Sequence, residues 1–286
     1  MNPSSASDAA RLFFVSGMPR AGSTLLVNLL AQNPQHHVTP TSGLIHLVLA
    51  VMERWTQVAE FQAQGLEQVK PQVEASLQGL LLGFHRQALS QGKCVFDKSR
   101  GWLDYVEPLE QVLQRRLKIL VPIRDVRSVV ASFEKMYRRR GIAWRYPQGQ
   151  KYALSTSAEQ RARTVLDPDQ VVGRSIVRLR DALSRVGDRL LLVPYGRFTE
   201  FPQAAMQALH QTLELPPYEY DPLHVAQQTH EDDNFVGQDL HRIRERIEPQ
   251  AAEPWTGLLS PDLAAEIAEE YADINALAAG PVASGG

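Results

Sequence analysis

A glycine-containing loop near the N-terminus has the residue types of a phosphate-binding turn. In FFVSGMPRAGSTLL, an apolar run leads into a loop bounded by Gly17 and Gly22, and a helical pattern opens at Ser23-Thr24. The unpaired N–H groups and the dipole of such a helix start attract an anion. The glycine spacing matches the loop of nucleotide kinases, but Ser23 stands where those enzymes place lysine. Arg20 is therefore the cation that this loop offers to an anion.

The segment LVPIRDVRSVVASFEK predicts a second anion site. Arg124 ends an apolar run, and Ser132 lies eight residues later on a helix expected to begin near residue 126. Ligands bind at the strand ends of open α/β sheets, and a guanidinium with a hydroxyl suits the oxygens of a phosphate. The two segments together indicate two anion sites on neighbouring strand ends, more than ATP alone requires.

These residues need strands and helices that bring them together. Four short apolar runs, each followed by a helical pattern, span residues 12–16, 94–97, 117–123 and 189–194. Further helices are expected from Ser42, over residues 73–88 and 171–186, and after Ser260. Near-continuous apolar strands alternating with helices indicate a parallel sheet covered on both faces. We therefore predict an α/β fold, a three-layer sandwich with a central parallel sheet, in which residues 1–286 form a single domain with flexible ends at 1–10 and 280–286.

Composition narrows the class of protein. The chain has 286 residues, 44% of them hydrophobic, and a formal net charge of −2, so no bulk charge draws it to nucleic acid or acidic membranes. Its one cysteine, Cys94, excludes an internal disulfide framework and a cysteine-built zinc site. The apolar stretches are too short to span a bilayer, and the N-terminus does not resemble a signal peptide. We expect a cytoplasmic protein with no nucleic-acid or membrane partner, either a monomer or a homodimer.

The segments SGMPRAGSTLL and RDVRSVVAS resemble the two cofactor-binding motifs of sulfotransferases that use 3′-phosphoadenosine 5′-phosphosulfate (PAPS). Animal cytosolic enzymes have lysine at the position of Arg20. The tyrosylprotein branch and many small bacterial sulfotransferases carry a proline-arginine type of loop, and Arg20 fits that pattern. Arg124 and Ser132 keep the family spacing, and Tyr195, after the fourth predicted strand, matches the tyrosine on the adenine side. The resemblance extends from about residue 12 to residue 249, with the middle helices matching least, and implies the P-loop-like fold of these enzymes.

By this resemblance the chain binds PAPS at both sites, and its product would be adenosine 3′,5′-bisphosphate (PAP). The loop residues implied in cofactor binding are Gly17, Arg20, Gly22, Ser23 and Thr24. Arg124 and Ser132 would hold the 3′-phosphate, which distinguishes PAPS from ATP. In VGQDLHRIRERIEP, Arg242 is the first candidate for a further contact to that phosphate. No metal is expected, because the sulfuryl group carries less charge than a phosphoryl group.

The implied reaction is in-line transfer of the sulfuryl group to a hydroxyl or amine of a small-molecule acceptor. Negative charge grows on the oxygen that bridges to the leaving phosphate, so a second cation is expected beside Arg20. Lys98, in FDKSRGW after the second predicted strand, matches the catalytic lysine of the family.

The acceptor also has to lose a proton to a general base, and here the sequence departs from both well-known branches. The stretch HVTPTSG lacks the glutamate of the tyrosylprotein branch, and Arg100 stands where cytosolic enzymes have histidine. His46, early on a helix expected to face the loop, is the first candidate for the base. Asp97 is the second, unless it simply orients Lys98. His36 and His37 are predicted to be surface loop residues.

Two charged clusters point to different acceptors. The basic cluster consists of Lys135, Arg138, Arg139, Arg140 and Arg145. It fits either a solvated helix end or an anionic acceptor such as an acidic saccharide, whereas Glu231-Asp232-Asp233 would suit a cationic acceptor. The residues Trp102, Trp144 and Trp255 fit a pocket or the core equally well.

Two alternative functions remain open at this point. A P-loop small-molecule kinase using ATP would need a lysine beside Ser23, and the sequence has none there. A catalytically inactive nucleotide-binding protein is favoured by the absence of a standard base and by Gly196-Arg197, where the family usually has acidic residues after the tyrosine.

Overall fold

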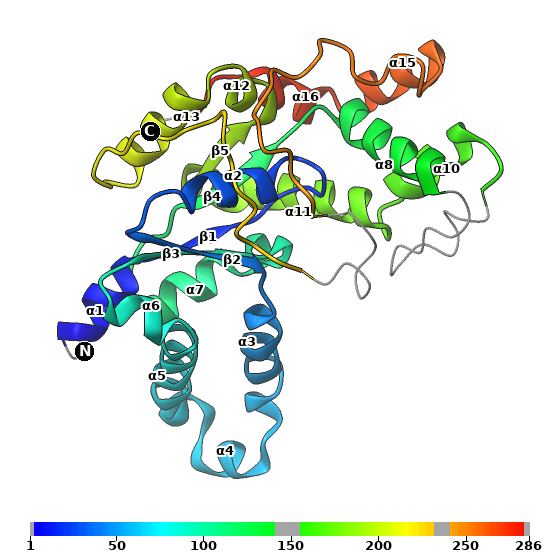
Figure 1. The fold of residues 1–286 in the computed structure, drawn as a ribbon. Helices are drawn as coiled ribbons and strands as arrows, with labels where there is room; N and C mark the ends of the chain where they lie inside the picture. The colour runs from blue at the N-terminus through cyan, green and yellow to red at the C-terminus, as the bar shows by residue number, and fades with distance from the viewer. Residues whose placement is uncertain (1–2, 141–154, 232–240, 283–286) are drawn as a thin grey trace.

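The computed structural model describes residues 3–140, 155–231 and 241–282, and builds them around one five-stranded parallel sheet (Figure 1). The strands are β1 (Leu12–Val15), β2 (His36–Thr41), β3 (Cys94–Lys98), β4 (Ile119–Ile123) and β5 (Leu190–Pro194). Their order in the sheet is β2-β3-β1-β4-β5. In register, Val15 lies opposite both Lys98 on β3 and Leu120 on β4, so the carboxyl ends of the three central strands share one edge.

Alternate residues of each strand point to opposite faces of the sheet. Both faces are apolar here, and helices cover each of them. Phe13 and Val15 pack on one side with helices α2 (Ser23–Leu30), α12 (Tyr195–Glu200) and α13 (Pro202–Thr212). Leu12 and Phe14 pack on the other side. The helices of that second layer are α3 (Leu44–Met52), α5 (Leu66–Phe84), α7 (Val106–Leu113), α8 (Val126–Arg140), α11 (Val171–Val186), α15 (Pro261–Glu270) and α16 (Ala272–Ala279). The predicted three-layer α/β sandwich is confirmed.

The remaining elements lie around this body. Residues 3–10, part of the predicted flexible N-terminal end, form helix α1 (Pro3–Ala10). Figure 1 shows α3 and α5 side by side as an arm, with α4 (Ala59–Gln64) at its tip. The other short elements are η1 (Trp55–Gln57), α6 (Arg86–Ser90), η2 (Arg100–Tyr105), α10 (Ala158–Leu166) and η4 (Gly187–Arg189). Within the described ranges, none of the helices is both long and apolar enough to cross a bilayer.

Several helix boundaries follow the sequence signals closely. The helices expected at residues 171–186 and after Ser260 are present, and the Ser260 hydroxyl accepts a hydrogen bond from the N–H of Leu263. The helix expected over residues 73–88 instead begins at Leu66 and is interrupted at His85, where the chain turns into α6.

Strand β2 was not expected from the sequence, and it corrects the prediction that His36 and His37 belong to a surface loop. β2 is an edge strand, where Pro40 is tolerated because one side of the strand pairs with no neighbour. His37 is exposed, but His36 is 7% exposed and packs its ring edge against Phe96 of β3, 5.0 Å between centroids. HHVTPT lacks an apolar run, so its strand character depends on pairing with β3.

Burial of His36 makes the stability of the fold depend on pH. Burial lowers the pKa of His36 to about 4, although a hydrogen bond to the Leu30 carbonyl opposes the shift. The folded chain therefore disfavours protonation, and stability is lost as the pH falls from about 6.5, the unfolded pKa, toward 4. We expect His36 to remove about 2 kcal/mol from the free energy of unfolding between pH 7 and pH 5.

Urea denaturation at both pH values, of the parent chain and of His36→Gln, measures this contribution. The substitution should flatten the pH dependence, whereas a control His224→Gln, at a side chain that is 82% exposed, should leave it unchanged. Equal pH dependence in the parent and in His36→Gln would contradict the assignment.

Candidate active site

The predicted phosphate loop is held in an unusual backbone conformation between β4 and Tyr195. Gly17 has φ 138°, and a Cβ there would lie 2.8 Å from the carbonyl oxygen of Pro122. Gly22 has φ 97°, and a Cβ there would lie 2.5 Å from Cδ2 of Tyr195. Glycine at both positions therefore lets the loop pass close to its neighbours and deliver the chain into α2.

A cavity of about 910 Å³ lies at the carboxyl-terminal edge of the sheet and opens onto this loop. It is lined by most of the residues predicted to bind the cofactor or act in catalysis: Arg20, Gly22, Ser23, Thr24, Lys98, Arg124, Ser132, Tyr195 and Arg242. Gly17 and His46 are not in the lining. Because the first N–H groups of a helix have no partner within it, the start of α2 offers donors to this cavity.

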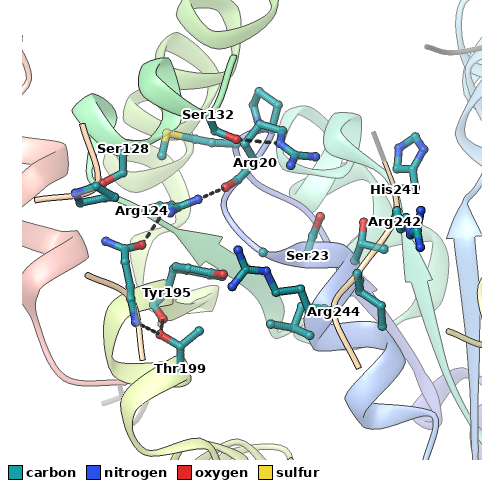
Figure 2. A pocket seen from close by; sticks show the side chains of 18 of the residues that line it. Arg20, Ser23, Arg124, Ser128, Ser132, Tyr195, Thr199, His241, Arg242 and Arg244 are labelled. Carbon is teal, nitrogen blue, oxygen red and sulfur yellow. Dashed lines mark hydrogen bonds between the residues drawn. The ribbon is translucent and has the colours of Figure 1, made fainter. Parts of the chain in front are cut away.

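Arg20 connects the two predicted anion sites. Its backbone is left-handed, with φ 61°, which is uncommon for a residue other than glycine. Its Nε donates a hydrogen bond to Oγ of Ser132, 3.1 Å, and its carbonyl oxygen accepts one from Nη1 of Arg124, 3.1 Å (Figure 2). The two motifs are more than 100 residues apart in the sequence, yet they form one continuous group of donors.

The Arg124 guanidinium is held on three sides. It lies over the ring of Tyr195, 4.3 Å from the centroid, and its Nε donates to Oε1 of Gln250, 2.7 Å. Burial lowers the pKa of Arg124, and the charge of Arg20 acts in the same direction. Gln250 was not among the predicted site residues, because it follows Arg124 by 126 positions in a segment without regular structure.

Ser128 is a further cavity residue that the sequence did not single out. Its hydroxyl is buried and has no hydrogen-bond partner among the described residues. It lies on α8 four residues before Ser132, so the two hydroxyls share a helix face beside Arg124 (Figure 2). The spacing alone is a weak signal, since serine is common on exposed helix faces. An unpaired buried hydroxyl here fits a site that receives anion oxygens.

Lys98 ends β3 with its ammonium group in the cavity. Its side chain is 6% exposed, and Nζ donates to Oγ1 of Thr24, 3.3 Å, and to Oε1 of Glu231, 3.1 Å. Burial lowers the pKa of Lys98, while the neighbouring Glu231 carboxylate opposes that shift. The register that places Lys98 beside Val15 thus brings its cation to the start of α2.

Glu231 is the central acidic group of the cavity. Its Oε1 also accepts hydrogen bonds from the backbone N–H and the hydroxyl of Thr41, and its Oε2 lies 3.0 Å from Nδ1 of His241. Burial alone would raise the pKa of Glu231, but His241, Lys98 and Thr41 together hold it at about 2. The sequence indicated an acidic cluster here without a partner for it, because Thr41 and Glu231 are 190 positions apart.

The structure does not bring either predicted general base to the cavity. His46 is exposed on α3, so the expectation that this helix turns it toward the phosphate loop is wrong. Asp97 precedes Lys98 on β3 and therefore points to the opposite face of the sheet. It is fully buried there, 3.0 Å from Nε2 of His85 and accepting a 2.8 Å hydrogen bond from Nε1 of Trp102. Asp97 thus neither faces an acceptor nor orients Lys98.

Other predicted residues lie in varied places. Arg242 and Arg244 both line the cavity, and Figure 2 shows Arg244 pointing between Tyr195 and Ser23, with Arg242 beside His241. Of the three candidate tryptophans, the two that are described belong to the packed body: Trp102 is fully buried, and Trp255 is 9% exposed against Arg127. Outside the described residues are Trp144, Arg145, Asp232 and Asp233, and the side chain of Arg140.

Within the described ranges, no three or more His, Cys, Asp or Glu side chains are grouped to hold a metal.

The comparisons with known proteins agree with this fold. Residues 13–220 match the model of the sulfotransferase family, and the chain belongs to that family. Among solved structures, it is similar to the sulfotransferase domain from the curacin biosynthetic pathway, with 18% identity, a TM-score of 0.51, and coverage of 91% of this chain and 96% of that one. It is also similar to sulfotransferase STF9 from Mycobacterium avium, with 16% identity, a TM-score of 0.50, and coverage of 92% and 76%. No curated protein sequence matches the chain. Family membership identifies an enzyme that transfers sulfuryl groups.

The close approach of Gly22 and Tyr195 predicts a large cost for a side chain at position 22. We expect Gly22→Ala to lower the free energy of unfolding by about 2–3 kcal/mol, through backbone strain at positive φ and the collision with Tyr195. Gly92→Ala is the matched control, because Gly92 has φ 76° with open space around it, and should cost only about 1 kcal/mol. Urea denaturation measures both variants, and an equal loss in the two would show that Tyr195 does not constrain the loop.

Proposed function

We propose that this enzyme transfers the sulfuryl group from PAPS to a hydroxyl or amine of a small-molecule acceptor. The observation that carries the proposal is the junction of two anion sites at one sheet edge, where Arg20 bonds to both Ser132 and Arg124. A donor with a single phosphate chain needs the loop alone, whereas a donor with an additional 3′-phosphate needs both sites.

The residues present fit such a donor. The α2 start, with Ser23 and Thr24, provides donors for a phosphosulfate, as does Arg20. Arg124 would hold the 3′-phosphate together with Ser132 and Ser128, whose buried hydroxyl has no partner among the described residues. The ring of Tyr195 lines the same cavity and would support the adenine side. When bound, PAPS supplies a sulfuryl group attached to a phosphate leaving group.

Lys98 and Arg20 act on the charge that develops during transfer. Both cations line the cavity beside the start of α2, and Thr24 accepts a hydrogen bond from Lys98. Donors placed in advance stabilise growing negative charge without having to reorganise, and their effect is stronger where water is excluded. Lys98 suits this role because it is buried and its side chain is held in place by Thr24 and Glu231.

His241 takes the place of His46 as the proposed general base. It lines the cavity, and its Nδ1 faces the Glu231 carboxylate at 3.0 Å. A carboxylate on one ring nitrogen sets the orientation and tautomer of the imidazole, so Nε2 is the atom we assign to receive the acceptor proton. Glu231 is itself a weak base, because Lys98 and His241 hold its pKa at about 2.

Nucleotide binding tests the donor assignment. In EDTA, PAP should bind more tightly than ADP, because only PAP places a phosphate on Arg124. A charged hydrogen bond contributes about 1.5–3 kcal/mol, so Arg124→Ala should weaken PAP binding roughly 10–150-fold. Calorimetry measures both ligands on both proteins, with Arg86→Ala, an exposed arginine on α6, as the control. Equal affinity for PAP and ADP, or a need for magnesium, would contradict the donor assignment.

Turnover of radiolabelled PAPS with a panel of hydroxyl and amine acceptors tests the catalytic roles. Lys98→Ala should lower kcat about 100-fold or more, because a prepared cation is lost. His241→Ala should lower kcat about 100-fold or more, because the acceptor keeps its proton. His46→Ala is the matched control and should retain the parent rate, since His46 lies outside the cavity. A parent rate in Lys98→Ala would remove it from the mechanism, and equal rates in the two histidine variants would remove His241.

A further inference from the structure

One face of helix α8 extends the cavity beyond the two anion sites. Ser128, Ser132, Lys135 and Arg139 all line the cavity, and their spacing places them on one side of the helix. Arg139 follows Ser132 by seven residues, about 10 Å farther along the helix axis. Arg139 is therefore centred about two helical turns from a phosphate bound between Arg124 and Ser132, and this end of the face can contact a different group.

The basic cluster at the end of α8 divides into two parts. Arg138 points to Glu134, 2.9 Å, and donates to the carbonyl oxygens of Gly257 and Leu258, so it fastens α8 to a neighbouring segment. Lys135 and Arg139 are exposed cavity residues, and in the part of the chain that the structure describes neither pairs with a carboxylate. Among the described residues, these two cations therefore make no ion pair that competes with binding a ligand.

The cavity carries more positive charge than the proposed donor can neutralise. The cations that line it are Arg20, Lys98, Arg100, Arg124, Lys135, Arg139, Arg242, Arg244 and Arg246. Among the described lining residues only Glu231 and Glu248 carry a carboxylate. The donor brings roughly four negative charges, counting its phosphomonoester as doubly charged. A net positive lining that persists after the donor is bound favours an acceptor that is itself an anion.

The one described residue of the acidic segment, Glu231, does not favour the competing hypothesis of a cationic acceptor. Its carboxylate already interacts with Lys98, Thr41 and His241, so it is not available to a second cation. Met136, 8% exposed and located between Lys135 and Arg139 in the sequence, adds an apolar surface to the lining.

We propose that the acceptor carries an anionic group, a carboxylate or a phosphate monoester, which Lys135 and Arg139 bind while its hydroxyl or amine faces the reaction centre. This inference rests on the proposed function, because it assigns the acceptor side of the same cavity. An arginine fork matches both anions, so the experiment has one arm for each.

The test measures binding of matched probes to the protein–PAP complex by calorimetry. The carboxylate pair is 4-hydroxybenzoate and its methyl ester, and the phosphate pair is 4-hydroxyphenyl phosphate and 4-methoxyphenol. We expect at least one anionic member to bind 10-fold or more tightly than its neutral partner. The same preference should appear in kcat/KM when radiolabelled PAPS replaces PAP.

Two variants assign the preference to α8. Lys135→Gln/Arg139→Gln keeps most of the apolar stems and should reduce the selectivity for the anion to about twofold or less, and Lys135→Glu/Arg139→Glu should invert it. Arg86→Ala, which removes an exposed arginine outside the cavity, should keep it. PAP affinity should change by less than about threefold in Lys135→Gln/Arg139→Gln and in Arg86→Ala.

Each other outcome overturns the proposal. If neither anion binds more tightly than its neutral partner, or if selectivity survives in Lys135→Gln/Arg139→Gln, α8 does not bind an anionic acceptor. A 10-fold loss of PAP affinity in that variant would assign Lys135 and Arg139 to the donor instead. Failure of the parent chain to bind PAP is a separate result, which would reject the donor assignment in "Proposed function" before the acceptor is examined.

Discussion

The placement of two arginines beside each other at one sheet edge is the constraint on which the site depends. Burial lowers the pKa of Arg124, and repulsion from the charge of Arg20 lowers it further. The fold offsets both effects locally through the Tyr195 ring, Gln250 and the Arg20 carbonyl. An anion bound between Arg20 and Arg124 would relieve this repulsion. The pair of cations that lowers the stability of the folded chain therefore favours the binding of an anionic ligand.

Neighbouring charged residues at the end of β3 point to opposite faces of the sheet, and each has its own set of partners. Lys98 faces the cavity and pairs with Glu231, whereas Asp97 faces the opposite layer, where His85 and Trp102 satisfy its oxygens. Breaking either buried group of partners would leave an uncompensated charge, which is more costly than losing a surface ion pair. Thr24 and Glu231 therefore hold Lys98 on the cavity side of the sheet, while Asp97 belongs to the core on the other side.

Family membership identifies the general chemistry, and the described residues of the cavity give it a particular lining. The similar solved structures share the fold at 16–18% identity. In this chain the cavity holds a histidine paired with Glu231 and the exposed cations of α8. Those residues come from segments far apart in the sequence, and the shape and charge of the cavity follow from how the sheet brings them together.

The sequence by itself determined the class of fold and the two motifs that line the cavity, because those signals are local. An apolar strand, the glycines at positions 17 and 22, and the spacing from Arg124 to Ser132 each act within a few residues of the chain. The tertiary structure alone decided the edge strand β2, the exposure of His46, the direction of Asp97 and the pairing of Glu231 with Lys98. Each of these depends on which strand is a neighbour or on a contact between residues far apart in the chain. No local pattern carries that information, since strand pairing and long-range charge pairing are settled only when the sheet assembles.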